Sequence, residues 1–285
     1  MKFGIFSKHG ALNSGPVFNA LTDAIKRKGW QALDHDDSAD VAVIWSVLWD
    51  GRMKSNRQIW DRFKKNNRPI LILEIGALDR GKLWKVSLNG INGNGYFGPL
   101  ANENTRKQKL GISLSPWRSG NNIILCGQHP QSQQWENMPP MNMWMNETIK
   151  TVRKYTDRKI IVRPHPRAKN ILTEKFQNVE IQFPLHLPNT YDSFDFEKTL
   201  EEAWAVINWN SNPAVVAALR GVPVFVGTES MANAVGNLDL ANIENPSKPC
   251  RDQWANDLAY TEWSIDEIRK GEPLDRLTEK LTSYL

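Results

Sequence analysis

The chain contains little cysteine, with two cysteines in 285 residues. Cys126 and Cys250 lie far apart, and neither belongs to a close pair of thiols or to a Cys/His group with the spacing of a zinc site. The sequence therefore predicts neither a disulfide framework nor a structural zinc site. Because Cys126 ends an apolar run, we expect it to be a core residue.

Long hydrophobic segments are also missing. No run approaches the roughly 20 apolar residues that cross a bilayer. The first residues, from Met1 to Phe6, begin a strand without the apolar core of a signal peptide. We therefore expect a soluble, cytoplasmic protein with no membrane partner. The sequence also indicates no stable protein partner.

Neither sign of charge dominates, since 36 Lys and Arg stand against 31 Asp and Glu, with a pI near 9.1. This moderate basic balance is compatible with a phosphate-bearing ligand or a nucleic acid and does not select between them. Tryptophan is abundant, with twelve residues. The length favours two domains of roughly 100 to 150 residues each.

Near-continuous apolar runs alternate with amphipathic segments along the first half. This pattern is typical of a parallel sheet that is covered on both faces. The expected strands are residues 3–7, 30–34, 41–49 and 69–75, and the expected helices are residues 17–28 and 56–65. Residues 84–97 are glycine-rich and indicate a strand at the sheet edge followed by turns.

The segment 101–120 is polar and basic, which indicates a linker or a mobile flap, and we place a domain boundary near Ser115. Strand and helix patterns then alternate again as far as residue 227. The predicted fold is α/β, with two Rossmann-like domains facing a cleft. An acceptor-side domain spans 1–115, a donor domain spans 116–250, and C-terminal helices follow at 251–285.

Polar side chains follow two apolar runs of the first half, at Asp50 and Glu74. A carboxylate at the carboxyl end of a parallel strand faces the usual ligand crevice, where it can act as a general base. Asp50 precedes a glycine and has an alternative role in a turn. His9, in the first loop, is a further candidate whose alternative is a solvated side chain. We expect Glu74 to be the base, ahead of Asp50 and His9.

Two apolar runs of the second half also end in polar loops. The first continues into Arg163, Pro164, His165, Pro166 and Arg167, whose cations suit a diphosphate, although a surface turn with solvated cations is the alternative. The second continues into Asn210, Ser211, Asn212 and Pro213, where amides, a hydroxyl and a helix N-terminus can contact phosphate. Glu229 and Ser230, after a later strand, are candidates to accept hydrogen bonds from ribose or sugar hydroxyls.

In these motifs, residues 120–230 resemble the donor domain of glycosyltransferases with the GT-B fold, in particular capsule-sugar, sialic-acid-type and polyol-phosphate transferases. The His-Pro element of that group is similar to residues 163–167. Its serine loop and the following Gly-x-Pro-Val are similar to residues 210–224. The resemblance implies that His165 and Ser211 contact the nucleotide and its phosphates. Trp49-Asp50-Gly51 is similar to the Asp-Gly element that holds the catalytic base in some sialic-acid-type transferases.

We expect a metal-independent transferase, and an inverting reaction is favoured because one carboxylate base suffices for it, although the sequence leaves the stereochemical outcome open. Such a transferase uses a nucleotide sugar as co-substrate, with a UDP-sugar favoured, and needs no other cofactor. We assign no Asp-x-Asp metal motif to the sequence, so a metal-dependent GT-A enzyme is not supported. The ribose-binding glutamate common in GT-B enzymes has no clear counterpart, which leaves the nucleotide open.

Residues 242–271 look like those of compact phage proteins. This makes a hydroxymethylated or otherwise modified base in phage DNA a candidate acceptor, with the host cytoplasm as the location. A phosphopolyol or nucleotidyl transferase on the same fold and a non-catalytic nucleic-acid-binding protein are the alternatives. The basic residues expected to contact DNA are Arg52, Lys54, Arg57, Lys64, Lys65, Arg106, Lys107 and Lys109.

Overall fold

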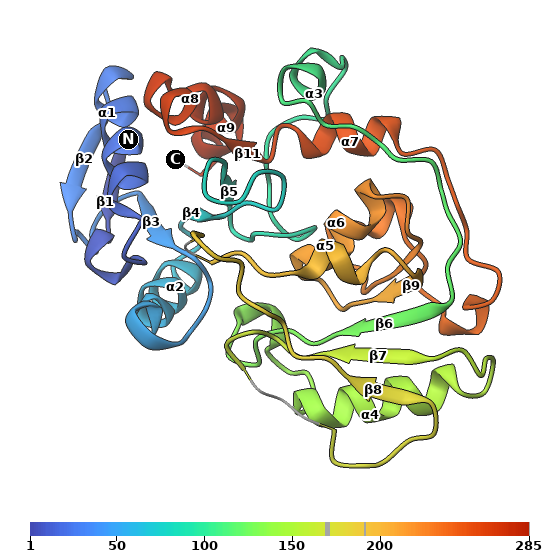
Figure 1. Cartoon of the computed structure of the whole chain (residues 1–285). Helices are drawn as coiled ribbons and strands as arrows, with labels where there is room; N and C mark the ends of the chain where they lie inside the picture. Colours follow the sequence, from blue (N-terminus) through green and yellow to red (C-terminus); the bar gives the residue numbers. More distant parts are fainter. Residues whose placement is uncertain (169–171, 191, 285) are drawn as a thin grey trace. The chain divides into compact units, whose positions relative to one another are not determined.

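A computed structural model describes residues 1–168, 172–190 and 192–284 of the chain (Figure 1). The described chain divides into two compact units. Unit 1 comprises Met1–Leu110, Gln131–Gln134 and the described part of Asn256–Leu285, and unit 2 comprises Gly111–Pro130 and Trp135–Ala255. The last helices therefore belong to the same unit as the first strands.

Unit 1 contains a six-stranded sheet in the order β11-β5-β4-β3-β1-β2. The strands are β1 (Lys2–Ile5), β2 (Gln31–Asp34), β3 (Val41–Trp45), β4 (Ile70–Ile75), β5 (Trp84–Leu88) and β11 (Glu262–Trp263). The pairs among β2, β1, β3 and β4 are parallel, whereas β5 runs antiparallel to both β4 and β11. The sheet is therefore mixed.

Helices cover both faces of this sheet, which explains the uninterrupted apolar strands. Val41, Val43 and Trp45 of β3 join one core with the helices α1 (Gly15–Arg27), α8 (Ile265–Lys270) and α9 (Glu272–Thr282). Ala42 and Ile44, at the alternate positions, join a second core with the helix α2 (Asn56–Lys65). Because side chains alternate along a strand, both faces of β3 need apolar residues.

A row of three charged side chains crosses the antiparallel part of this sheet. Lys85 of β5 lies opposite Glu74 of β4 on one side and opposite Glu262 of β11 on the other. Lys85 and Glu262 are fully enclosed, and burial raises the pKa of Glu262 and lowers that of Lys85. The Glu262 carboxylate also accepts hydrogen bonds from the N–H groups of Ala77 and Leu78, at 2.6 and 3.0 Å.

The sequence analysis placed the strand of residues 84–97 at the edge of the sheet, and this prediction was wrong. β5 is an interior strand, since β11 pairs with its free side. Gly76 allows this closure, because a Cβ atom there would lie 2.1 Å from the Glu262 carboxylate. The sequence signal for an edge was wrong because the covering strand lies far along the chain.

Unit 2 contains a five-stranded parallel sheet in the order β10-β9-β6-β7-β8. The strands are β6 (Asn122–Cys126), β7 (Ile160–Arg163), β8 (Val179–Ile181), β9 (Ala203–Ile207) and β10 (Val224–Phe225). The helix α4 (Met141–Val152) lies on one side of this sheet, and α5 (Phe196–Thr199) and α6 (Asn212–Leu219) lie on the other (Figure 1). The strand order is that of one Rossmann half, because β7 and β8 are added on one side of β6, and β9 and β10 on the other. The direction in which strands are added to the sheet therefore reverses between β6 and β9.

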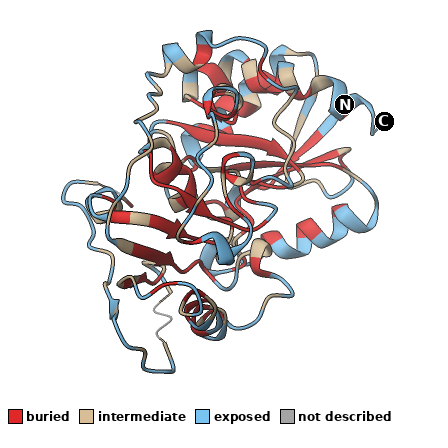
Figure 2. Cartoon of the chain, turned by 90° about the vertical axis from the view of Figure 1, so that its right-hand side faces the viewer, coloured by how far each residue is buried: buried red, intermediate tan, exposed pale blue. Residues whose placement is uncertain are grey.

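The strands of both sheets are mostly buried (Figure 2). In unit 2, Ile123, Leu125, Ile160 and Val162 share a core with the inward side of α4. Cys126 is buried at the end of β6, where burial raises the pKa of its thiol to about 12. The expected core position of Cys126 is confirmed.

The segment 101–120, expected to be a linker or flap, contains the short helix α3 (Thr105–Lys109), which is anchored in unit 1. The Arg106 guanidinium is 5% exposed, and it donates to the Glu267 carboxylate at 2.8 and 3.0 Å and to two backbone carbonyls. It also lies over the ring of Trp263. Arg106 is a structural residue, so its expected contact with DNA was wrong.

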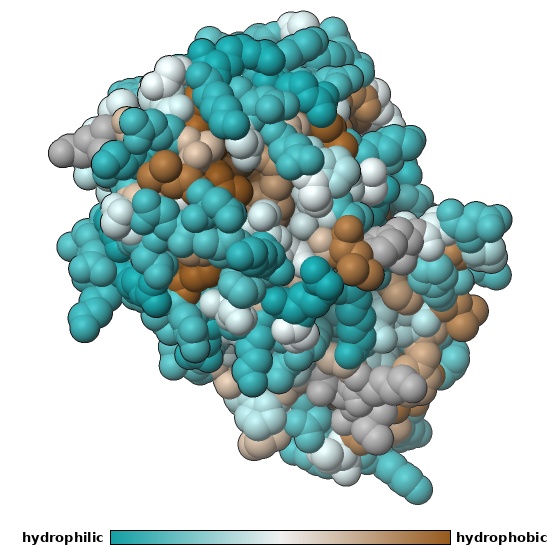
Figure 3. Space-filling model, turned by 90° about the vertical axis from the view of Figure 1, so that its left-hand side faces the viewer, coloured by the Kyte–Doolittle hydropathy of each residue, from teal (hydrophilic) through white to brown (hydrophobic). Residues whose placement is uncertain are grey.

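The predicted α/β fold class is confirmed, with parallel strands and covering helices in both units. The bounds of the units differ by a few residues from the expected division at 115 and 250, and the acceptor and donor roles stay predictions. The remaining helix, α7 (Asp252–Leu258), is short. Within the described residues, no helix combines the length and the apolarity that a membrane crossing requires. The face in Figure 3 is mainly hydrophilic, with small separate groups of hydrophobic side chains.

We expect Arg106→Ala to lower the free energy of unfolding by roughly 3 kcal/mol, because it leaves the Glu267 carboxylate buried with only Lys109 as a cationic partner. Urea unfolding against pH measures this loss. Although burial alone would raise the pKa of Glu267, hydrogen bonds from Arg106 and Lys109 hold it well below the ordinary value of 4.5. The ion pair therefore stabilises the fold above that pH and loses its effect as the pH falls towards the lower pKa.

The exposed Lys54 provides a matched control, because Lys54→Ala removes one positive charge from the surface of the same unit. We expect it to change stability by less than about 0.5 kcal/mol at any pH. Equal stability losses in the two variants would contradict the structural role of Arg106.

Candidate functional site

Buried polar side chains of unit 2 gather where the strand order reverses, after β6 and β9. In an open parallel sheet this reversal creates a crevice at the carboxyl ends of the strands. Residues 127–130 follow β6, and residues 208–211 connect β9 to α6. The loops after β6 and β9 are therefore neighbours, and of these two the sequence analysis had selected the loop after β9.

Asn208 and Ser211 fix the start of α6. Asn208 is 1% exposed, its Oδ1 accepts from the Ser211 N–H at 2.9 Å, and its Nδ2 donates to Ser211 Oγ at 2.8 Å. The hydroxyl of Ser211 is thus held by Asn208 instead of capping the first turn of α6. The turn keeps the partial positive charge of a helix N-terminus, which favours an anion beside Ser211.

Gln128 connects the two loops, although the sequence analysis did not select it. Its side chain is 2% exposed, and its Oε1 accepts from the Asn210 N–H at 3.4 Å. Within the described part of the chain, its Nε2 has no hydrogen-bond partner. Since a buried amide without an acceptor is costly, this group is suited to a ligand oxygen. The available signal was the polar Gln-His-Pro that ends the apolar run of β6.

His165 lies in the loop after β7, next to His129 of the β6 loop. The two imidazole centroids are 5.2 Å apart with their planes nearly perpendicular. The Nδ1 atom of His165 accepts from the Arg167 N–H at 3.1 Å, so the neutral ring carries its proton on Nε2. His165 therefore has a donor suited to a phosphate oxygen. His129, 8% exposed, is a second residue that the sequence analysis missed.

Arg163 and Arg167 do not form the expected cationic clamp. Arg163 is the last residue of β7, 3% exposed, and its guanidinium contacts Asp195 at 2.5 Å and Gln182 at 2.8 Å. Arg167 pairs with Asp192 at 2.6 Å. Both positive charges therefore have carboxylate partners within unit 2, and the expectation that the three side chains aim at one anion does not match their contacts.

The ionisation of Asp195 is consistent with its role as the ion-pair partner of Arg163. Although burial alone would raise its pKa, hydrogen bonds from the Leu185 N–H and the Arg163 guanidinium hold it below its ordinary value. The carboxylate is thus a lasting counterion of Arg163 at neutral pH. Arg163 serves to hold the chain around residue 195.

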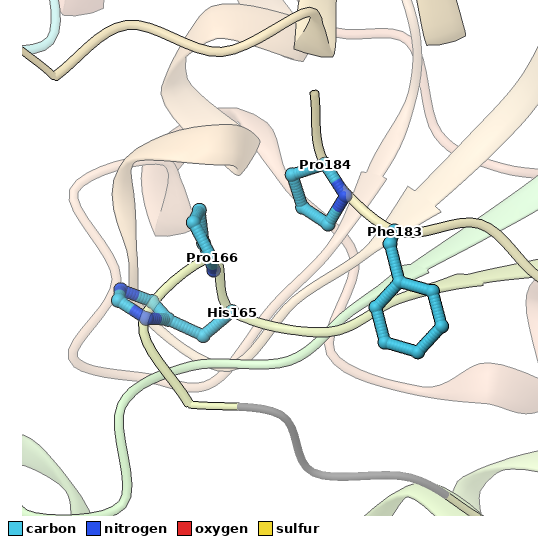
Figure 4. Close-up of a pocket in the computed structure, with 4 residues that line it drawn as sticks. All are labelled: His165, Pro166, Phe183 and Pro184. Atoms are coloured by element: carbon cyan, nitrogen blue, oxygen red, sulfur yellow. The ribbon is translucent and has the colours of Figure 1, made fainter. Parts of the chain in front are cut away.

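A pocket of about 320 Å³ opens beside the β7 loop, lined by His165, Pro166, Phe183 and Pro184 (Figure 4). His165 and Pro166 follow β7, and Phe183 and Pro184 follow the neighbouring strand β8. Two prolines and two rings make the lining rigid. Phe183 was not among the predicted residues, because one aromatic residue after a short strand gives no signal in the sequence.

The remaining candidates of unit 2 differ in exposure. Asn212 is the first residue of α6 and lies beside Ser211. Ser230 is 3% exposed, and its hydroxyl accepts from the Ala232 N–H at 3.2 Å, which is a local turn bond. Glu229 is exposed on the preceding turn. Of these three, Asn212 belongs to the cluster at the strand reversal.

Glu74 lies within β4, not in a loop beyond it. Its Oε2 accepts from the Ser46 hydroxyl at 2.5 Å, and its Oε1 accepts from the Ile75 N–H at 2.7 Å. Ser46 itself has a positive φ of 61° directly after β3. Together with its place opposite Lys85, this gives the partly buried Glu74 a clear structural role.

His9 and Asp50 lie in the loops after β1 and β3, which are neighbours at the strand reversal of unit 1. The His9 ring stands edge-on to His35 at 5.6 Å. Arg52, in the turn after Asp50, donates to the Gly10 carbonyl at 3.1 Å and so joins the two loops. Asp50 is exposed and precedes Gly51, whose φ is 52°. Both predicted interpretations of Asp50, a base and a turn residue, fit this position.

One Asp-x-Asp sequence, Asp34-His35-Asp36, does occur in unit 1, at the end of β2. Asp36 Oδ1 accepts from both the N–H and the hydroxyl of Ser38 at 2.7 Å, and these hydrogen bonds hold its pKa below the ordinary value. Among the described residues, no three His, Cys, Asp or Glu side chains are grouped so that they could hold a metal ion.

Comparison with known proteins gives a fold and no family. No family model and no curated protein sequence matches the chain. Two solved structures of KpsC from Thermosulfurimonas dismutans are similar in fold. Its beta Kdo 2,4 transferase has a TM-score of 0.53 and 11% identity, and the match covers 94% of this chain and 98% of that one. Its beta Kdo 2,7 transferase has a TM-score of 0.50 and 15% identity, with 96% and 100% covered.

The likeness extends over nearly the full length of both chains, so it includes the α/β architecture of both units. It agrees with the predicted α/β fold class. At these identities it is a likeness of fold.

We expect Asn208→Ala to reduce the free energy of unfolding by about 1 to 3 kcal/mol, because it removes both side-chain bonds to Ser211 from a buried position. Ser211→Ala is the comparison, since the backbone N–H of residue 211 keeps its bond to Asn208. We expect its loss to be smaller. Chemical denaturation measures both, and an equal or larger loss in Ser211→Ala would contradict the central place of Asn208.

Proposed function

We propose that the protein is a glycosyltransferase that moves a sugar from a nucleotide-sugar donor to an acceptor hydroxyl. The observation that carries this proposal is the polar cluster at the strand reversal of unit 2. Gln128, Asn208, Ser211 and His165 gather there beside the N-terminus of α6. Such a crevice is the usual place for a nucleotide in an open parallel sheet. The fold likeness to two sugar transferases supports the same reading.

Each group of the cluster has a role suited to a leaving phosphate. The N-terminus of α6 and the hydroxyl of Ser211 favour negative charge, while the Nε2 protons of His165 and Gln128 can be donated to phosphate oxygens. Charge that develops on the leaving group is stabilised by donors that are already in position. A metal ion is not required by this arrangement, and we propose a metal-independent reaction.

For the general base we propose Asp50, which departs from the sequence-based preference for Glu74. The Glu74 carboxylate accepts two hydrogen bonds within unit 1 and faces Lys85. Asp50 is exposed in a loop at the strand reversal, and it belongs to the Asp-Gly element of the resemblance. One base that deprotonates the acceptor hydroxyl suffices for an inverting substitution. His9, in the adjoining loop, is then suited to orient the acceptor.

A modified base in DNA remains a candidate acceptor on the strength of the sequence alone. Of the basic residues expected to contact DNA, Arg106 is buried and Lys109 pairs with Glu267. Lys64 lies over the Trp60 ring at 4.9 Å. Five of the eight remain candidates, of which four are exposed and one is partly buried: Arg52, Lys54, Arg57 and Lys65, and Lys107. A phosphopolyol or nucleotidyl transferase would use the same phosphate contacts, and the choice depends on the group transferred.

We expect a nucleotide sugar to raise the melting temperature of the protein in a panel of UDP-, GDP- and CMP-sugars, free nucleotides and DNA. His165→Ala should weaken donor binding by roughly 1.5 to 3 kcal/mol, the range for a lost charge-assisted hydrogen bond. Lys175→Ala, which removes an exposed charge from unit 2, is the control. Stabilisation by DNA alone, with salt-sensitive affinity, would favour the non-catalytic nucleic-acid-binding alternative.

We expect Asp50→Asn to reduce turnover at saturating donor by about a hundredfold or more, the usual contribution of a general base, once an acceptor is known. Glu74→Gln keeps a hydrogen-bond acceptor for Ser46 and should retain most of the turnover. The two variants are matched, since each replaces a carboxylate by its amide. The reverse result, with Glu74→Gln inactive and Asp50→Asn active, would return the role of base to Glu74.

A further inference from the structure

The pocket between the β7 and β8 loops contains an aromatic ring that unit 2 leaves partly open. Phe183 is 48% exposed, and with Pro184 it forms one wall, while His165 and Pro166 form the other (Figure 4). An exposed phenyl ring beside two proline rings offers flat apolar surface to a planar ligand. The two cations nearest in sequence, Arg163 and Arg167, are paired with Asp195 and Asp192. The pocket therefore suits a neutral planar group better than an anion.

The wall formed by Phe183 and Pro184 is held on both sides by Arg163. Before the wall, the Gln182 side chain accepts from Arg163 at 2.8 Å. After the wall, Leu185 exchanges two bonds with Asp195, through its N–H at 2.9 Å and its carbonyl at 3.0 Å, and Asp195 is the ion-pair partner of Arg163. A single buried guanidinium thus fixes both residues that flank the wall.

His165 belongs to this pocket and also to the polar cluster at the strand reversal. Its ring stands edge-on to His129, which follows β6, and it lines the pocket with Phe183. The Gly127 N–H donates to the Arg163 carbonyl at 2.9 Å, which joins the loop after β6 to the end of β7. A ligand with a phosphate at the cluster and a ring in the pocket would contact His165 between the two.

We propose that this pocket binds the nucleobase of the donor nucleotide, with Phe183 as the stacking surface and Arg163 as the residue that positions the wall. The inference rests on the proposed use of a nucleotide sugar. In this proposal Arg163 does not contact the phosphates. It acts by holding Phe183 and Pro184 in place. Because every base has a flat π-face, stacking on Phe183 supplies affinity for any base. The preference for one nucleotide then comes from groups that contact the edges of the base.

The first test measures binding of nucleoside monophosphates and of ribose 5-phosphate by titration calorimetry, with no need for an acceptor. Phe183→Ala should weaken nucleoside monophosphate binding about tenfold or more and leave ribose 5-phosphate binding unchanged, since only the nucleoside monophosphate has a planar base to stack. Phe183→Tyr keeps the ring and should retain affinity within about threefold. Leu185→Ala, the control, removes an adjacent side chain that is 66% exposed and outside the pocket lining.

The second test examines the positioning role. Arg163→Ala should reproduce the loss of nucleotide affinity and raise the KM for the donor, with kcat at saturating donor retained. Asp195→Asn, which removes the partner charge without touching the strand residue, should give the same pattern in a weaker form. Arg163→Lys, which keeps one contact to Asp195, should recover part of the affinity.

The outcomes separate this inference from the proposed function. If nucleotides and nucleotide sugars bind to Phe183→Ala as to the wild type, the ring site is overturned while sugar transfer stands. If Phe183→Ala loses affinity equally for ribose 5-phosphate and for the nucleotide, the stacking role is overturned, because ribose 5-phosphate has no base to stack on Phe183. If neither nucleotide nor nucleotide sugar binds the wild-type protein, the ring site and the proposed donor fall together.

Discussion

Burial of the parallel strands on both faces, in the mixed sheet of unit 1 and the parallel sheet of unit 2, is the constraint on which this structure depends. Strands such as β3 and β6 must carry apolar side chains at successive positions, so polar groups are displaced to the strand ends. The carboxyl ends of parallel strands meet at one edge, which gathers these displaced groups. The proposed donor site is a result of that displacement, since Gln128, Asn208 and His165 all lie within two residues of the end of a buried strand.

Several charged groups in the interior are neutralised by another part of the chain. Lys85 lies between Glu74 and Glu262, Arg106 meets Glu267, and Arg163 meets Asp195. The contacts to Glu262, Glu267 and Asp195 join segments that are distant in sequence. Because a buried charge without its partner is strongly destabilising, such pairs fix which segments lie together. They therefore act as specific connections in a core that is otherwise apolar.

The sequence was sufficient for the elements whose pattern is local. The helix α2 was expected at residues 56–65 and has these bounds, and the apolar runs of β3, β4, β6 and β9 all form strands. The site was predictable as a place, because polar residues after apolar runs mark strand ends. The contacts within it were not, since the partner of Arg163 lies at residue 195 and no periodicity relates the two positions. For the same reason, two arginines looked like phosphate ligands, and Gln128 and Phe183 went unnoticed.

The antiparallel strand β11 affects how this chain can fold during synthesis. The strand β11 and the helices α8 and α9 leave the ribosome after the whole of unit 2. Even so, β11 completes the sheet that the first residues begin, and the two helices complete the core on one of its faces. Until then, β5 has an open edge, Lys85 lacks one of its two carboxylates, and one face of α1 lacks its covering helices. Domains usually fold in the order in which they emerge. Here unit 2, encoded in the middle, is the first that can close, and unit 1 must wait for its own end.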